Sequence, residues 1–172
     1  MMKNSSINNK LQYQIFCFLL IFLANMAHAN WGFDGSLIMP PKCRLSHSDP
    51  IKVSFGKVGV NKVDGIQYKK EIPYELICDG DLTQPWNISL TLSGATAGAG
   101  FDDATLQVKS DQNGNNVGIQ IQKDGQPITL NKAFVIDQET LPTLSAVIVK
   151  KAGTKLVGDT FNAIATLTVS FQ

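Results

Sequence analysis

The last twelve residues, FNAIATLTVSFQ, alternate apolar and polar side chains and carry no charge. The apolar set is Phe161, Ala163, Ala165, Leu167, Val169 and Phe171. A period of two predicts a β-strand with one buried face. Edge strands of ordinary sandwiches are short, or are blunted by charge or proline. A long, uncharged strand at the chain terminus therefore predicts that another strand covers its free edge.

Alternation recurs along the rest of the chain in short segments separated by Gly, Asn, Asp and Pro. The predicted strands lie within residues 51–60, 68–78, 86–94, 106–110, 117–130 and 144–161, and Asp124-Gly125 predicts a hairpin turn in the fifth of these. No window sustains a period of 3.6 residues. Short strands at this spacing predict an all-β sandwich of antiparallel sheets, each with one buried and one wet face.

The first 29 residues have the features of a secretory signal peptide. Lys3 and Lys10 precede an uncharged run, 15–24, that is too short to span a bilayer, and Ala27-His28-Ala29 fits a cleavage site. An uncleaved anchor is the alternative. Cleavage would remove two lysines and no acids, so the formal charge would change from +1 to −1. A near-neutral chain with one remaining arginine argues against nucleic-acid binding.

Two cysteines, Cys43 and Cys78, remain after cleavage. An even pair in an exported protein favours a disulfide, which would close a loop of about 36 residues. A zinc site would need two further ligands, and a catalytic cysteine would need a suitably placed base, but the mature chain has only His47. We therefore expect no metal and no cofactor.

The segment before Cys43 carries a second alternating stripe. Its members are Trp31, Phe33, Gly35, Leu37 and Met39, and Pro40-Pro41 separates them from the body because proline cannot donate a ladder hydrogen bond. The arm, residues 30–42, is therefore expected to be a separate strand. It could pair with the last strand of the same molecule, or with another molecule by strand addition.

These features together resemble the pilin subunits of the chaperone–usher pathway, in particular the minor and adaptor pilins of P-pilus and type 1-like fimbriae. The resemblance rests on Gly158 with the alternating strand and the penultimate Phe171, and on the cysteine pair. It also rests on VSFGKV (53–58), on IPYELIC (72–78) and on the arm WGFDGSLIMPPKC. The match covers essentially residues 30–172. Lys42 is an extra residue before the cysteine, and the arm is short.

The resemblance implies an incomplete, six-stranded immunoglobulin-like sandwich with an N-terminal donor-strand arm. It implies a signal peptide (1–29), a donor-strand extension (30–42) and a pilin domain (43–172). The five arm residues named above would form the donor strand. The acceptor groove, recognised by chaperone and usher, would comprise Gly158, Phe161, Ala163, Ala165, Leu167, Val169, Phe171 and Gln172.

The implied function is that of a structural, non-enzymatic subunit, minor or adaptor, of a cell-surface fimbrium that supports adhesion. Its partners would be a periplasmic chaperone, an outer-membrane usher and neighbouring subunits, with no nucleic acid and no membrane span in the mature chain. The alternatives are a tip adhesin or lectin that binds a host glycan, and a self-contained secreted immunoglobulin-like module. A hydrolase is disfavoured because the acidic pairs Asp102-Asp103 and Asp79/Asp81 lie in Gly-rich loops and the sequence has no nucleophile elbow.

Overall fold

The computed structural model describes residues 12–14, 30–39, 41–45, 50–80, 86–137 and 139–171. The chain divides into two units, 1–38 and 39–172. In the first unit, residues 12–14 are helical and residues 30–38 have no regular secondary structure. The rest of the predicted signal peptide lies outside the described residues.

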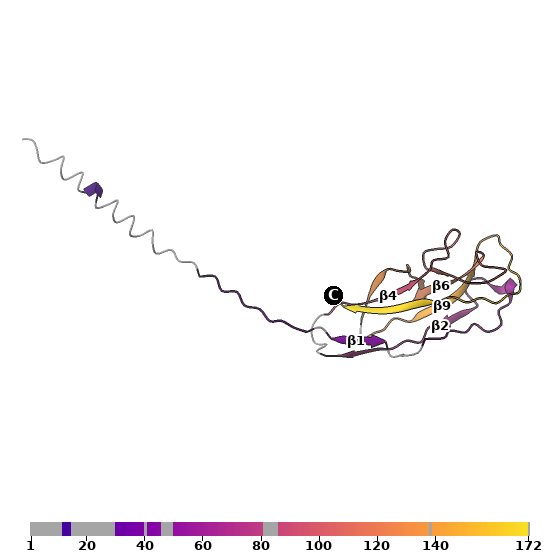
Figure 1. Ribbon diagram of the computed structural model, residues 1–172, viewed down its shortest axis with the longest axis horizontal. Coiled ribbons are helices and arrows are strands. Elements are labelled where there is room, and N and C mark those ends of the chain that lie inside the picture. The colour runs from indigo at the N-terminus through magenta and orange to yellow at the C-terminus, as the bar shows by residue number, and fades with distance from the viewer. Residues whose placement is uncertain are drawn as a thin grey trace, which may run out of the picture. The chain divides into compact units, whose positions relative to one another are not determined.

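The second unit contains the sheets of the protein (Figure 1). β1 (Lys42–Leu45) pairs with β3 (Leu76–Asp79). β10 (Ala165–Phe171), β4 (Ile88–Gly94) and β8 (Ala133–Ile136) form a second sheet in that order. The third sheet has the order β2 (Lys69–Glu71), β9 (Leu144–Lys150), β6 (Val117–Lys123) and β5 (Thr105–Gln107), with β7 (Gln126–Pro127) paired to β6. A short 3-10 helix, η2, spans Val60–Lys62.

The core lies between these sheets in two apolar clusters. The larger cluster joins Leu92 of β4 to Ile119, Ile121 and Ile148 of the third sheet. The smaller one contains Ile88, Leu90 and Ile136, and the half-buried Cys43 and Cys78 pack against it. Each strand of the second sheet therefore contributes one apolar face to a shared interior, as expected for a sandwich.

Several predicted strands are confirmed. β4, β6, β9 and β10 lie where the alternation placed them, and all are antiparallel to their partners. Asp124 and Gly125 have φ angles of 51° and 81°, so both occupy the left-handed region that a type I′ hairpin turn requires. The predicted hairpin is therefore present.

Other predictions need correction. Residues 51–59 and the arm residues 30–39 are not in strands, although both alternate. β8 was not predicted because AFVI is too short to show a period. The predicted wet faces are also wrong for β6 and β9, where successive residues are buried. Gly118 explains part of this, because an added Cβ there would lie 2.4 Å from Thr105 Cγ2. The Thr105 side chain of the neighbouring strand β5 therefore occupies the space beside Gly118 on that face of β6.

Candidate functional site

The last strand, β10, is an edge strand with an apolar inner face. It pairs with β4 over its full length, from Ala165 opposite Gly94 to Phe171 opposite Ile88. Among the described residues, no strand pairs with its other edge. Leu167, Val169 and Phe171 are half-buried against the core, whereas the Thr and Ser residues between them are exposed. The alternation predicted for this strand is therefore present, and one row of backbone donors and acceptors is left without a strand partner.

A second segment without a strand partner, residues 51–58, lies across an apolar cavity from residues 156–163. Val53, Phe55 and Val58 are half-buried, and Ser54 and Lys57 are exposed. Within the part of the chain that the structure describes, this segment makes no backbone–backbone hydrogen bond. It has the side-chain alternation of a strand without a neighbouring strand, which is why it is not part of a sheet.

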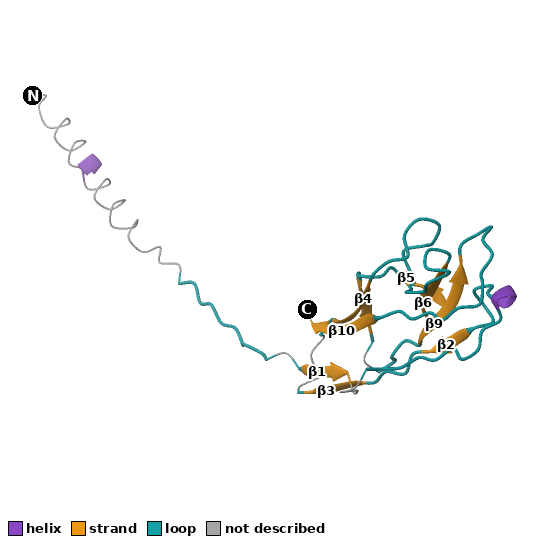
Figure 2. Cartoon of the chain, turned by 45° about the vertical axis from the view of Figure 1, so that its right-hand side comes forward, coloured by secondary structure: helices purple, strands orange, loops and turns teal. Residues whose placement is uncertain are grey.

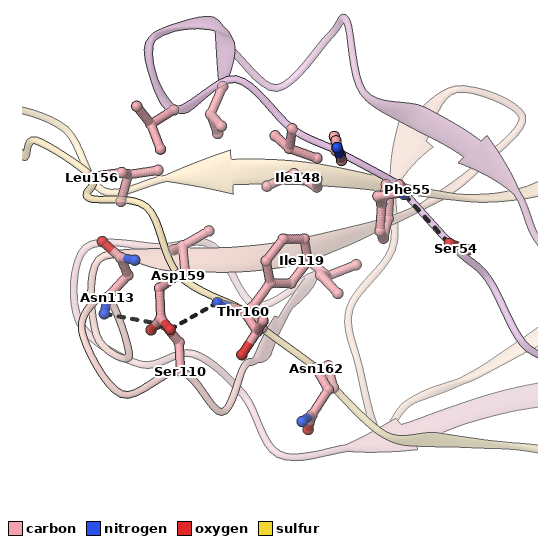
Figure 3. A pocket seen from close by; sticks show the side chains of 18 of the residues that line it. Ser54, Phe55, Ser110, Asn113, Ile119, Ile148, Leu156, Asp159, Thr160 and Asn162 are labelled. Atoms are coloured by element: carbon pink, nitrogen blue, oxygen red, sulfur yellow. Dashed lines mark hydrogen bonds between the residues drawn. The ribbon is translucent and has the colours of Figure 1, made fainter.

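An open cavity of about 600 Å³ lies between this segment and residues 156–163 (Figure 3). Its apolar lining includes Ile119 of β6 and Ile148 of β9, with Phe55 on one wall and Leu156 and Phe161 on the other. The rings of Phe55 and Phe161 have centroids 6.1 Å apart and are tilted by 43°. Ser54, Ser110, Thr160 and Asn162 add polar groups at the cavity. The arrangement suits an extended peptide with a large apolar side chain.

Near the cavity, one wall is tied to the turn at residues 110–116. The Asp159 carboxylate accepts hydrogen bonds from Ser110 Oγ at 2.6 Å and from the Gln112 N–H at 2.8 Å. These bonds, the Ser110 bond first, hold the pKa of Asp159 below its ordinary value of 3.8. The carboxylate is therefore ionised at neutral pH. No local sequence pattern predicts this interaction, because its members are 47 to 49 residues apart.

The predicted donor residues are exposed in the first unit and at its boundary. Trp31 is 79% exposed and Phe33 is 90% exposed, and Leu37 and Met39 are exposed as well. An added Cβ at Gly35 would meet no atom within 4 Å. Exposed aromatic side chains in a row are unusual for a solvated segment and are typical of one that binds a partner.

The predicted groove residues differ in location and in exposure. Phe161 and Ala163 line the cavity, while Leu167, Val169 and Phe171 lie along β10. Ala165 is exposed. Gly158 is exposed too, and an added Cβ would meet open space, so the structure gives no steric reason for a glycine there. Gln172 lies outside the described residues.

The predicted disulfide is confirmed. Cys43 and Cys78 are joined by a disulfide and lie opposite one another in the β1–β3 register. β1 in turn lies beside β10, and Figure 2 shows β1, β3 and β10 close together. The disulfide therefore joins β3 to β1, the strand that lies beside β10.

In the described ranges, no group of three or more His, Cys, Asp or Glu residues could hold a metal ion. Across those same residues, no helix is long and apolar enough to cross a bilayer. His47, the only histidine of the predicted mature chain, lies outside them.

Comparisons with known proteins agree with this geometry. The fimbrial protein family matches residues 31–172, so the chain belongs to that family. YfcQ, an uncharacterised fimbrial-like protein of Escherichia coli strain K12, is 36% identical over 154 residues, which cover 87% of this chain and 91% of the relative.

Two solved structures share the fold. The P pilus rod subunit PapA has a TM-score of 0.56 at 16% identity and covers 83% of this chain, with all of PapA covered. The P pilus adaptor subunit PapF has a TM-score of 0.52 at 19% identity, with 78% of this chain and 98% of PapF covered. The predicted immunoglobulin-like pilin fold is therefore confirmed.

Family membership defines the protein at a coarse level. It is a fimbrial protein, a structural component of a fimbrium.

Proposed function

We propose that this chain polymerises by donor-strand complementation and exchange. Residues 30–42 act as the donor strand of one subunit, and the groove between residues 51–58 and β10 accepts the donor strand of another. The pilin domain spans residues 43–172, and residues 1–29 are a signal peptide that directs export through the periplasm. A periplasmic chaperone covers the groove before assembly, and an outer-membrane usher carries out the exchange.

The observation that carries this proposal is the pair of unpaired edges. Residues 51–58 and residues 156–163, which lead into β10, line the same open apolar cavity. Neither residues 51–58 nor the outer edge of β10 pairs with a strand within the described ranges. A strand placed there would satisfy the backbone groups of both walls and would cover the exposed apolar lining. Because donor and acceptor are different surfaces, the contact is heterologous and propagates into a fibre.

The short arm, residues 30–42, favours a minor or adaptor subunit over a major one, and the presence of two surfaces favours a position inside the fibre. A subunit at the end of a fibre needs only one of the two surfaces, whereas this chain has both an alternating arm and an open groove.

The test uses the mature chain without residues 30–39 as an acceptor. It is purified with its chaperone and mixed with synthetic donor peptides: its own arm (30–42) and the arms of the other subunits encoded beside it. A peptide of the same composition with the alternation of residues 30–39 scrambled is the control. Chaperone release and a stable peptide complex are measured by size exclusion and mass spectrometry.

We expect one arm peptide to displace the chaperone and the scrambled peptide to fail. Preference for another subunit's arm supports the minor or adaptor role, and preference for its own arm points to a major subunit instead. If no arm binds, or if the intact mature chain is a soluble monomer without chaperone or peptide, donor-strand complementation is wrong.

A further inference from the structure

Side chains of the turn at residues 110–116 form hydrogen bonds with residues 157–159, which belong to one wall of the cavity. The buried Asn113 accepts a hydrogen bond from the Val157 N–H at its Oδ1 atom and donates one from Nδ2 to the Val157 carbonyl, both at 2.9 Å. Its amide therefore bonds both backbone groups of one residue, as a neighbouring strand would. Asn113 is only 6% exposed, so solvent does not compete strongly for these bonds.

Two further contacts continue the attachment toward β10. Asp159 accepts the bonds from Ser110 and Gln112 described above. Lys109 and Asn162 then exchange two backbone hydrogen bonds of 2.7 and 3.1 Å. We call residues 109–113, bonded in this way to residues 157–162, the turn clamp. Figure 3 shows Asn113, Ser110 and Asp159 together on this side of the cavity.

The two walls of the cavity therefore differ. The turn clamp bonds the backbone groups of Val157 and Asn162 in the wall at residues 156–163. Residues 51–58, in contrast, make no backbone–backbone bond among the described residues. An open cavity lined by Ile119, Ile148 and Phe161 favours collapse, because closing it would remove apolar surface from water. The hydrogen bonds from residues 109–113 to residues 157–162 oppose that collapse, because closing the cavity by moving this wall would break them.

We propose that Asn113 and Asp159 are positioning residues that preform the acceptor groove by holding residues 157–162 away from residues 51–58. The inference rests on the proposed function, because it states how the acceptor site of that function is kept open. Both residues also line the cavity, but the proposed effect acts through their bonds to the turn and to residues 157–162 and not through contact with the donor strand. When the cavity is open in only a fraction of molecules, the measured affinity falls by that fraction for a donor whose side chain fills the cavity, and not for a donor that lacks this side chain.

The test compares Asn113→Ala with Asn115→Ala. Asn115 lies in the same turn, is exposed and makes no hydrogen bond with its side chain in the described structure, so it is a matched control. Each variant, purified with its chaperone, is titrated with the arm peptide that binds the wild type. We expect about tenfold weaker binding for Asn113→Ala, equivalent to about 1.4 kcal/mol, and wild-type binding for the control.

A second measurement separates positioning from general destabilisation. Donor peptides with alanine at each apolar position are tested against both proteins. If the turn clamp acts at the cavity, the effect of Asn113→Ala disappears for the one peptide that lacks the cavity-filling side chain and persists for the others. Equal loss for every peptide would show that Asn113 only stabilises the fold, and would overturn the inference.

Hydrogen exchange gives a readout that needs no donor. The Val157 amide should be protected in the wild type and should exchange faster in Asn113→Ala. If Asn113→Ala does not fold, Ser110→Ala removes one bond to Asp159 and serves in its place, with a smaller loss of peptide affinity expected. Unchanged affinity in the folded variant contradicts the inference. Failure of the wild type to bind any arm contradicts the proposed function instead.

Discussion

Phe161 tests the groove most directly, because it belongs to the core, to the cavity and to the proposed donor contact. Its ring packs against the larger apolar cluster and lies 6.1 Å from the Phe55 ring. Replacing a fully buried Phe by Ala costs about 3–5 kcal/mol. Because Phe161 is half-buried, we expect Phe161→Ala to lower the free energy of unfolding by about half of that, ~1.5–2.5 kcal/mol.

The control is Ile164→Ala, three residues along the chain. Ile164 is 80% exposed and does not line the cavity, so its replacement should change stability by less than about 0.5 kcal/mol. For a domain of this size, 1.5–2.5 kcal/mol corresponds to a decrease in Tm of about 5–10 °C.

The assay is thermal unfolding followed by circular dichroism, with and without a saturating arm peptide. The peptide should raise the Tm of the wild type and of Ile164→Ala by the same amount, because it binds only the folded state. Phe161→Ala should show a lower Tm without peptide and a smaller increase with it. If Phe161→Ala has the same peptide-dependent increase as the wild type, Phe161 does not contact the donor and the proposed groove is misplaced.

Three further predictions follow from single contacts. Replacing both Cys43 and Cys78 by Ser removes a crosslink between residues separated by 35 positions and should cost about 4 kcal/mol, measured as a lower urea midpoint; an unchanged midpoint would contradict it. Tyr74→Phe removes the bond from the Tyr74 hydroxyl to the Pro142 carbonyl, 2.6 Å long, and should cost about 0.5–1.5 kcal/mol. Burial, with a smaller effect of the Asp124 carboxylate, raises the pKa of Tyr74 to about 12, so the last tyrosinate absorbance step should disappear in this variant. Because the pKa of Asp159 is lowered in the folded state, its stabilising effect is present above the ordinary value of 3.8 and is lost as pH falls below it. The Tm difference between wild type and Asp159→Asn should therefore be constant from pH 5 to 8 and shrink below about pH 3.8, and a constant difference down to pH 2 would refute this.

Sequence alone identified the strands that have a wet face and a nearby turn signal. β10 alternates cleanly, and Asp124-Gly125 fixes the hairpin because few residue pairs accept positive φ at both positions. Sequence alone did not predict that some of the strands it located are buried on both faces. β9, LSAVIVK, is buried on both faces at its start, so period two does not describe its surroundings. It also failed for β8, which is too short to show a period.

For the candidate site, the sequence predicted one wall and missed the other. Phe161 and Ala163 were assigned to the groove from the terminal motif, and the structure places both at the cavity. Residues 53–58 showed alternation, but nothing in the sequence says that they would lie without a strand partner. The contact between Asn113 and Val157 spans 44 residues, and no local pattern encodes it.

The other sheet edges of this molecule support the proposal that the free edge of β10 accepts a donor strand. β2, another edge strand, has the sequence KKE and is three residues long, so charge and shortness both discourage pairing. β8 is an edge of four residues. β10 is seven residues long and has no charge. A chain that protects its other edges by charge or shortness, yet leaves its longest edge uncharged beside an apolar groove, has the features expected when that edge must remain able to pair with an incoming strand.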